Sequence, residues 1–540
     1  MRGTSIQHAF VGFALLGALA THARARPFEG LSRRDQMSLL YKPQFQFTST
    51  GEPLVNVGLS INGRQATFSG PRGVRLLPAG EDGVELPARP GEKLRVRVAK
   101  ATPARMAYWA AVRVAGAKAQ RTASALERWR GRGFEPRHFD TGGVVGLEQR
   151  VLDNRVTLIG VQRHKTRAAA KKAAARIGKT HKAQLHVHEE LGDPPTGVLE
   201  VLGEGGEVRA RVRDLVWVVA SQGEVVELDG ASYRGTLYAT LDAKGRLAVA
   251  NSVPVEKMLY GLVPAEIFPR APLEALKAQA VTARGEVLAK VGTRHFGEPF
   301  RVCAKQHCQV YKGHSRELPR TSRAVKETRG EVLWGDGRLI DTVYSASCGG
   351  HTEHNDVVWE STADRHLRGR QDGASTPGDL SDEPTLRRFL AQDTGAHCAR
   401  IRIGKTSRYR WTRRFGQSEL RRLLRKRANL GAVRAIEVLG RGVSGRVTGV
   451  RVIGAKDTLL VKREYPVRQL FGGLFSGMFV VDAEAPGEDG LPSGFVLRGG
   501  GWGHGVGMCQ TGAMGMAEEG HNFRRILRHY YQGGSVQKLY

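Results

Sequence analysis

Cysteine is scarce in this chain of 540 residues, with five in all, at positions 303, 308, 348, 398 and 509. So few cysteines exclude a disulfide-stapled scaffold, and the hydrophobic core must carry the fold. In an exported protein the odd number leaves at least one thiol that is free, metal-bound or paired with another molecule. The 68 glycines and 22 prolines show no collagen-like period.

Apolar runs of about 20 residues are missing after the first segment, so we expect no transmembrane segment in the mature chain. The first segment begins with Arg2 and continues with 12 mostly apolar residues, 9–20, followed by small residues. This pattern predicts a signal peptide over residues 1–25 and an exported protein in the periplasm or cell wall. An N-terminal anchor that stays attached is the alternative. No cysteine follows the apolar run, so a lipoprotein is not expected.

Acidic residues are too few to balance the basic ones. The chain has 52 Asp and Glu against 83 Lys and Arg, a net charge of +31 at pH 7. Such a protein is attracted to polyanions, which include nucleic acid, anionic lipid and acidic wall polymers. The excess is spread along the chain and no recognised nucleic-acid motif is present, so we expect no nucleic-acid partner.

Hydrophobic patterning predicts a multidomain α+β fold that is rich in β-strands. Residues 45–100 and 197–250 alternate apolar and polar residues between glycines and prolines, which is typical of short strands. Residues 104–190 instead show a strand–helix–strand pattern twice, with helices over 118–130 and 166–177. The second helix buries Ala170, Ala173, Ala174 and Ile177 on one face. This segment is therefore expected to form a small α/β sandwich with one sheet.

The segment 104–190 resembles a SPOR domain, a module that binds peptidoglycan strands stripped of their stem peptides. The matching residues are the strand opening at Tyr108 and Trp109, the turn at Gly133 and Phe134, and the half from Arg155 to Ile177. A ferredoxin-like domain without a known ligand is the alternative, and the sequence leaves both open.

One glutamate stands in an unusually apolar segment. Glu266 lies in VPAEIFP (263–269), just before a helix that begins at Pro272 and repeats apolar residues at spacings of three and four. If Glu266 lines a cleft, the loss of solvation raises its pKa and keeps it protonated near neutral pH. A protonated carboxyl can then deliver a proton to a leaving oxygen. The alternative is an exposed loop glutamate.

Soft metal ligands cluster further along the chain. Cys303, His307 and Cys308 lie within six residues, and His295 lies eight residues before Cys303. Such spacing suits tetrahedral Zn²⁺. We expect one structural zinc bound by these three residues, with His295 or Cys348 as the fourth ligand. A disulfide, either Cys303–Cys308 or Cys308–Cys348, is the alternative in an exported protein.

Two glycine-rich segments carry polar and aromatic residues. In YSASCGGHTE (344–353) paired glycines allow close approach of the backbone to a ligand. The segment GGGWGHGVGMCQTGA (499–513) is too rich in glycine for an ordinary helix or strand, and it holds Trp502 and His504. It suits a sugar-binding cleft. Phosphate binding is the rival, but the G-x-x-x-x-G-K-[ST] motif is absent.

Together these segments resemble the stage II sporulation protein D family, also called SpoIID/LytB. The matching motifs, in the family's order, are PVEKMLYGLVPAE (254–266), EALKAQAVTAR (274–284), CQVYKG (308–313), YSASCGGHT (344–352), GGGWGHGVGMCQTGAMGMAEEG (499–520) and ILRHYYQGG (526–534). The resemblance places a catalytic region over 197–540, with core motifs at 251–353 and 495–534 and with 52–100 as a candidate addition. Thr511 stands where many members carry Trp, and Cys348 and Cys509 replace Ser of some members.

The resemblance implies a peptidoglycan lytic transglycosylase that cleaves glycan strands lacking stem peptides. The family's catalytic glutamate falls on Glu266, which would act as general acid and base and leave 1,6-anhydromuramic ends. No cofactor is needed for this chemistry, and zinc at the Cys/His site would be structural. The motifs imply substrate contacts from Arg284, Tyr344, Ser345, Ser347, Gly349, Gly350, Trp502, His504 and Gln510. The expected partners are peptidoglycan glycan strands and a wall amidase. The alternative function is a non-catalytic wall-binding protein that enhances such an amidase.

Overall fold

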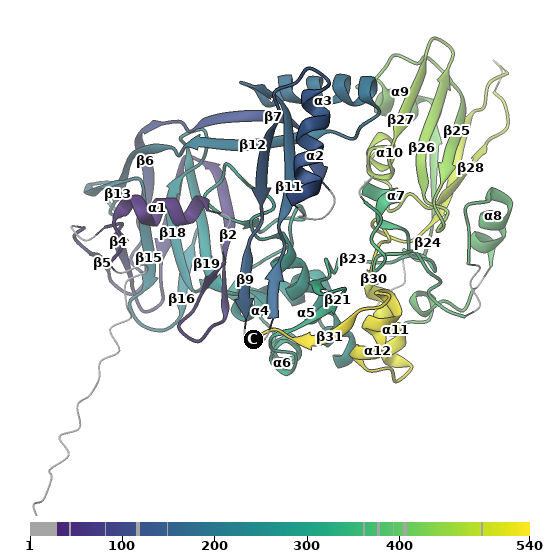
Figure 1. Ribbon diagram of the computed structural model, residues 1–540. Helices are drawn as coiled ribbons and strands as arrows, with labels where there is room; N and C mark the ends of the chain where they lie inside the picture. The colour runs from purple at the N-terminus through teal and green to yellow at the C-terminus, as the bar shows by residue number, and fades with distance from the viewer. Residues whose placement is uncertain are drawn as a thin grey trace, which may run out of the picture.

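The computed structural model describes residues 30–42, 45–80, 83–114, 119–147, 150–359, 362–374, 378–392, 394–402, 408–487 and 490–540. The predicted signal peptide lies outside these residues. They form a β-rich α+β fold, as the sequence predicts. Figure 1 shows a two-sheet sandwich, a small α/β module above it, a helical core below, and a further β-rich part on the right. None of the helices in these ranges has the length and apolar character needed to span a bilayer.

Two mostly antiparallel sheets form the sandwich. The first has the order β1-β2-β19-β18-β15-β4-β5, with β20 parallel to β2. Its strands are β1 (Gln46–Phe47), β2 (Pro53–Gly63), β4 (Val74–Pro78), β5 (Leu86–Ala88), β15 (Val216–Ala220), β18 (Thr236–Leu241), β19 (Leu247–Pro254) and β20 (Val302–Cys303). The second, in the order β14-β13-β6-β3-β16-β17, contains β3 (Gln65–Ser69), β6 (Leu94–Thr102), β13 (Thr196–Leu202), β14 (Val208–Arg213), β16 (Val225–Leu228) and β17 (Ala231–Arg234). The two sheets share one apolar core, and α1 (Arg33–Tyr41) packs on the first sheet.

The sandwich joins two stretches of chain that the sequence pattern separates. Residues 46–102 supply β1 to β6, and residues 196–254 supply β13 to β19. Strand β6 pairs with β13, and β2 pairs with β19. The expected boundary at 197 is therefore wrong, because the stretch at 45–100 and the start of the family region fold as one unit. Local alternation identifies strands but not their distant partners.

Between β6 and β13 the chain forms the small α/β module that the sequence predicts. Its sheet has the order β12-β7-β11-β8, with α2 and α3 packed on one face. Its elements are β7 (Arg105–Val114), α2 (Ala119–Arg130), β8 (Arg137–Thr141), β11 (Val156–His164), α3 (Arg167–His181) and β12 (His186–Asp193). This is the arrangement of a ferredoxin-like fold. Helix α3 buries the predicted face of Ala170, Ala173, Ala174 and Ile177.

A hairpin within this module reaches down to the helical core. It consists of β9 (Val144–Leu147) and β10 (Arg150–Asp153), and Leu152 is buried among the core helices. Just after it, Asn154 Nδ2 donates to the carbonyls of Leu288 and Val291 at 3.0 and 2.8 Å. These carbonyls lie at the end of a helix, where no intrahelical donor remains. The hairpin thereby fixes the module to the core.

The helical core surrounds one buried helix, α5. Its elements are α4 (Val255–Glu266), α5 (Leu273–Lys290), α6 (Pro319–Glu327), β21 (Glu331–Gly335), β22 (Arg338–Leu339), α11 (Gln510–Glu518), α12 (Phe523–Tyr530) and β31 (Ser535–Lys538). The sequence predicts one buried face for α5, but the structure buries almost every residue from Ala275 to Lys290. Alanine and glycine on the remaining faces let α4, α6, α11 and α12 pack closely around it.

The region between the family motifs at 344–352 and 499–520 forms a separate β-rich insertion. One sheet holds β24 (Arg410–Gly416), β28 (Phe479–Ala483) and β29 (Gly494–Gly500), and the other holds β25 (Val433–Arg441), β26 (Val447–Gly454) and β27 (Thr458–Lys462). The helices are α7 (Asn355–Trp359), α8 (Glu383–Ala391), α9 (Gln417–Leu424) and α10 (Glu464–Leu470). This insertion has an apolar core of its own, distinct from that of the α5 helices.

A buried ion pair links α4 to α5. Arg284 Nε and Nη2 each donate to a carboxylate oxygen of Glu256 at 2.8 Å. Glu256 also accepts from the Gly330 amide at 3.1 Å and the Tyr540 hydroxyl at 2.7 Å. Burial acts to raise the pKa of Glu256, but Arg284 and these donors hold it below its ordinary value. The pair therefore ties two helices and the last residue of the chain together.

We expect Glu256→Gln to destabilise the protein by about 3–5 kcal/mol, because it leaves the buried Arg284 charge without its partner. The measurement is the free energy of unfolding in urea. Glu437→Gln is the matched control, since Glu437 pairs with Arg451 in an exposed contact that is worth less than about 1 kcal/mol. Equal losses for the two variants would contradict the role given to the pair.

Candidate active site

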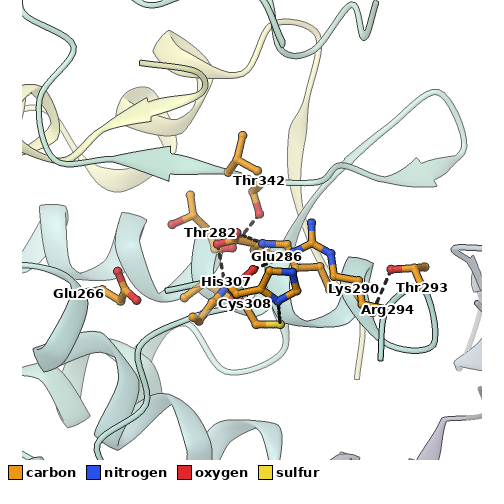
Figure 2. Close-up of polar contacts among 12 residues, drawn as sticks. Glu266, Thr282, Glu286, Lys290, Thr293, Arg294, His307, Cys308 and Thr342 are labelled. Carbon is orange, nitrogen blue, oxygen red and sulfur yellow. Dashed lines mark hydrogen bonds and ion pairs between the residues drawn. The ribbon is translucent and has the colours of Figure 1, made fainter. Parts of the chain in front are cut away.

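Glu266 is the last residue of α4. The helix ends there because Ile267 is extended, at φ −121° and ψ 155°. The carboxylate is half-buried, and its Oε1 accepts a hydrogen bond from the Val310 amide at 2.6 Å. Figure 2 shows Glu266 at the end of its helix, to one side of the cluster that contains Glu286 and His307. The alternative of an exposed loop glutamate is wrong.

The surroundings of Glu266 favour its protonated form. Burial raises its pKa to about 7, and the nearby carboxylate of Glu286 adds to the rise. The Val310 amide and Lys290 act in the opposite direction, but more weakly than burial. The carboxyl is thus poised to give and take a proton near neutral pH, as the sequence predicts for a desolvated glutamate.

A buried polar group next to Glu266 is not anticipated by the sequence motifs. Glu286 pairs with Lys290 one helical turn away (Figure 2). Its other oxygen accepts from Gln309 Nε2 at 2.8 Å. Gln309 Nε2 also donates to the Ala283 carbonyl at 3.1 Å. Gln309 directly precedes Val310, the donor to Glu266. The sequence feature that could have revealed this group is the pair of opposite charges at i and i+4, Glu286 and Lys290, inside an otherwise apolar helix.

Gln510 and Tyr344, from two further family motifs, lie near Glu266. Gln510 Nε2 donates to the backbone carbonyl of Glu266 at 2.9 Å and to Gln279 Oε1 at 3.0 Å. Tyr344 pairs with Met508 in the short parallel ladder of β23 (Tyr344–Ser345) and β30 (Met508–Cys509). Burial raises the pKa of Tyr344 and the charge of Glu266 adds to the shift, so the phenol stays neutral.

Ser345 and Ser347 supply hydroxyls beside this ladder. Both are buried, and their Oγ atoms have no hydrogen-bond partner among the described residues. A buried hydroxyl without a partner is costly.

Trp502 and His504 extend the site outward. Ser347 and Trp502 exchange backbone hydrogen bonds at 3.0 and 2.8 Å, and the Trp502 side chain is 48% exposed. The ring of His504 lies 4.9 Å from that of Trp359. Burial lowers the pKa of His504 to about 3, so its imidazole is neutral. Exposed aromatic rings beside polar groups suit carbohydrate.

Three residues that the motifs imply as substrate contacts serve the fold instead. Arg284 is fully buried, and its guanidinium is occupied by the ion pair described above. Gly349 and Gly350 have φ values of 74° and 103°, and a Cβ on Gly349 would lie 2.7 Å from the backbone of Gly500. A Cβ on Gly350 would lie 2.7 Å from the ring of Phe389. The paired glycines therefore permit close approach of protein segments.

The predicted Cys/His ligands converge. The ligand atoms of His295, Cys303, His307 and Cys308 all lie within 4.8 Å of one another. His295 Nε2 lies 3.3 Å from Cys308 Sγ, and His307 Nδ1 lies 3.8 Å from Cys303 Sγ. Two thiolates and two imidazoles form a donor set that fits tetrahedral zinc. Cys348 is not part of this cluster but belongs to a second one, and all five cysteines are unpaired thiols.

The fold and site define a protein in which the half-buried carboxyl of Glu266 is held by several motif segments. The chain belongs to the stage II sporulation protein D family, described as stage II sporulation protein, whose model matches residues 243–334. This match contains Glu266 and the Cys/His cluster. A domain of unknown function (DUF8618) matches residues 353–507, the insertion described above.

Similar proteins support this assignment. An uncharacterized protein of Brachyspira hyodysenteriae is 30% identical over 315 residues, which cover 57% of this chain and 73% of that protein. The amidase enhancer of Bacillus subtilis is 28% identical over 339 residues, covering 58% of this chain and 45% of the enhancer. Stage II sporulation protein D of Bacillus subtilis is 24% identical over 312 residues, covering 53% and 76%.

The raised pKa of Glu266 predicts a pH-dependent effect on stability. Because the pKa rises from 4.5 to about 7 on folding, the folded state binds this proton more tightly than the unfolded chain. The contribution is complete below pH 4.5 and is lost as the pH rises to about 7. We expect Glu266→Gln to be more stable than wild type at about pH 8, with the difference shrinking toward about pH 4.5. Urea unfolding at several pH values measures this, and an unchanged difference would refute the assigned pKa.

Proposed function

We propose that this protein is a peptidoglycan lytic transglycosylase that cleaves glycan strands lacking stem peptides. The observation that carries the proposal is the half-buried carboxyl of Glu266, whose pKa burial raises to about 7. The names of the relatives, amidase enhancer and stage II sporulation protein D, support a role at the cell wall and export to the periplasm or wall. A net charge of +31 suits an acidic wall polymer.

One carboxyl suffices for this reaction. Protonated Glu266 gives its proton to the glycosidic oxygen while the bond from that oxygen to the sugar C1 breaks. The resulting carboxylate then accepts the proton of the muramic acid 6-hydroxyl, whose oxygen bonds to C1 and closes the 1,6-anhydro ring. Ordinary glycosidases need a second carboxylate to activate water or to act as nucleophile. Here the nucleophile is a hydroxyl of the same sugar residue, and its high effective molarity makes the second carboxylate unnecessary.

Glu286 is not a second catalytic carboxylate in this proposal. It is buried, and its two oxygens are taken by Lys290 and Gln309. Its role is to raise the pKa of Glu266 and, through Gln309, to hold the segment that carries Val310. Gln510 is likewise a positioning residue, since it binds the backbone of Glu266. Tyr344, Ser345, Ser347, Trp502 and His504 remain as the proposed substrate contacts.

A non-catalytic amidase enhancer is the competing function, favoured by the name of one relative. In either case the partners would be glycan strands and a wall amidase. The α/β module has the single sheet expected of the SPOR-like segment, with two helices on one face, and it is proposed to recruit amidase-treated glycan. Pull-down of the isolated module should favour amidase-treated over intact peptidoglycan. Equal retention on both, abolished by moderate salt, would indicate charge attraction alone.

We also propose one structural zinc at His295, Cys303, His307 and Cys308. The four donors fill a tetrahedral site, so no position remains for substrate. Cys308 directly precedes Gln309 and Val310, and the metal would therefore fix the segment that donates to Glu266. No step of the reaction passes through it.

We expect Glu266→Gln to lower the release of 1,6-anhydro products from denuded glycan strands by about 10²–10⁴, because glutamine cannot exchange a proton. Wild-type turnover should also fall as the pH rises above about 7. Mass spectrometry of the digest measures both effects. The control is Glu298→Gln, a half-buried carboxyl whose pKa burial also raises to about 7, but which faces Asp242 and Glu189. Absence of anhydro products from every denuded strand tested would favour the enhancer function.

Cys303→Ser should remove one zinc per chain and lower thermal stability more than it lowers the rate of any cleavage, because the site is closed to substrate. Metal analysis and thermal unfolding measure the two effects. Ser322→Ala, on α6 away from the cluster, is the control. A mapped Cys303–Cys308 disulfide in zinc-free protein would overturn the site.

A further inference from the structure

A second group of soft ligands lies outside the Cys/His site. The ligand atoms of Cys348, Asp372, Cys398 and Cys509 all lie within 4.8 Å of one another. All four side chains are completely buried, and Cys348 Sγ lies 3.8 Å from Cys398 Sγ. Two thiolates on one tetrahedral zinc are separated by about 3.8 Å, given Zn–S bonds of about 2.3 Å.

We propose that Cys348, Asp372, Cys398 and Cys509 bind a second zinc ion, which pins the insertion to the family motifs. Thiolate-rich tetrahedral sites are characteristic of zinc. The inference does not depend on the proposed catalytic function, because it concerns different residues and a structural role.

The surroundings of the four residues resemble the outer shell of a metal site. Cys509 Sγ accepts from the Cys348 amide at 3.1 Å and the Gly512 amide at 3.3 Å, at the start of α11. Amide donors and a helix N-terminus stabilise a thiolate. Asp372 accepts from the Cys398 amide at 2.9 Å and the Tyr530 hydroxyl at 2.6 Å. Such contacts orient metal ligands and tune their basicity.

The charge of the site is also compensated. Three thiolates and one carboxylate around Zn²⁺ leave two excess negative charges. Two arginines lie next to the cluster: the buried Arg446 donates from Nη2 to the Cys348 carbonyl at 3.0 Å, and the half-buried Arg410 donates from Nη1 to the Gly349 carbonyl at 2.9 Å. Asp372 accepts from two neutral donors, the Cys398 amide and the Tyr530 hydroxyl, one on each carboxylate oxygen. Each oxygen has a second lone pair that a metal could use.

A disulfide explains this cluster less well. Any bridge would use two of the three thiols and leave the third beside a buried carboxylate. Such a carboxylate without a cation is strongly unfavourable in a buried site. Zinc instead uses all four residues, and the three thiols give up their protons on binding.

The position of the cluster gives the metal its role. Cys348 and Cys509 belong to the family motifs at β23, β30 and α11 (Figure 1), whereas Asp372 and Cys398 come from the insertion at 353–507. Cys509 directly precedes Gln510, the residue that binds the backbone of Glu266. The second zinc would thus hold the insertion against the segments that shape the site.

The test uses the full chain, purified without added reductant or chelator. The double variant Cys303→Ser/Cys308→Ser removes the first site. We expect it to retain one zinc per chain, with X-ray absorption showing three sulfur ligands and one oxygen. Adding Cys398→Ala or Asp372→Asn should remove this zinc or weaken its binding at least about tenfold. Asp364→Asn is the control, because that carboxylate pairs with Arg338 away from both clusters.

The proposal would be overturned if the purified double variant contained no zinc. A mapped disulfide between any two of Cys348, Cys398 and Cys509 would also overturn it. Full zinc retention after both Cys398→Ala and Asp372→Asn would do the same. If the double variant does not fold, the wild type decides. Its zinc content is measured first, and its reactive thiols are counted after denaturation in chelator. Two zinc ions and five thiols per chain support the site. One zinc ion and three thiols indicate a disulfide among the cysteines and exclude the site.

Discussion

The bidentate contact between Arg284 and Glu256 joins the parts of the molecule on which the site depends. Glu256 lies in the first turn of α4, and Glu266 ends the same helix, so fixing the start of α4 against α5 also fixes where its last residue lies. The carboxylate of Glu256 also accepts hydrogen bonds from the Gly330 amide and the Tyr540 hydroxyl. These bonds connect α4 to the residues next to β21 and β31. A buried charge tolerates little displacement from its partner, because separation leaves both ions desolvated and unpaired.

Around Glu266 the structure favours desolvation over charge pairing. Lys290, the cation that most directly opposes the raised pKa of Glu266, is bound to Glu286 instead. Val310 and Gln510 hold the carboxyl and its backbone from two distant segments of the chain. This arrangement separates the carboxyl proposed to exchange protons from the groups that position it, a division typical of acid–base sites.

The parts outside the family motifs are attached at defined contacts. The α/β module reaches the end of α5 through its hairpin and Asn154. The insertion meets the motifs at the paired glycines, where backbones approach too closely for any side chain, and at the buried cluster of Cys348, Asp372, Cys398 and Cys509. Both attachments lie next to segments that hold Glu266. An added domain can thereby influence the site without contributing a residue to it.

Much of this protein could be predicted from sequence because its signals are local. The doubled strand–helix pattern, the buried face of α3, the grouping of Cys303, His307 and Cys308, and the desolvated Glu266 each depend on residues close together in the chain. Tertiary structure alone decided which strands pair across residues 102 to 196, and that His295 rather than Cys348 completes the Cys/His cluster. It also decided that Arg284 serves the fold and that four distant ligands meet. The physical reason is that burial and pairing depend on contacts between residues far apart in sequence, which local periodicity and spacing do not encode.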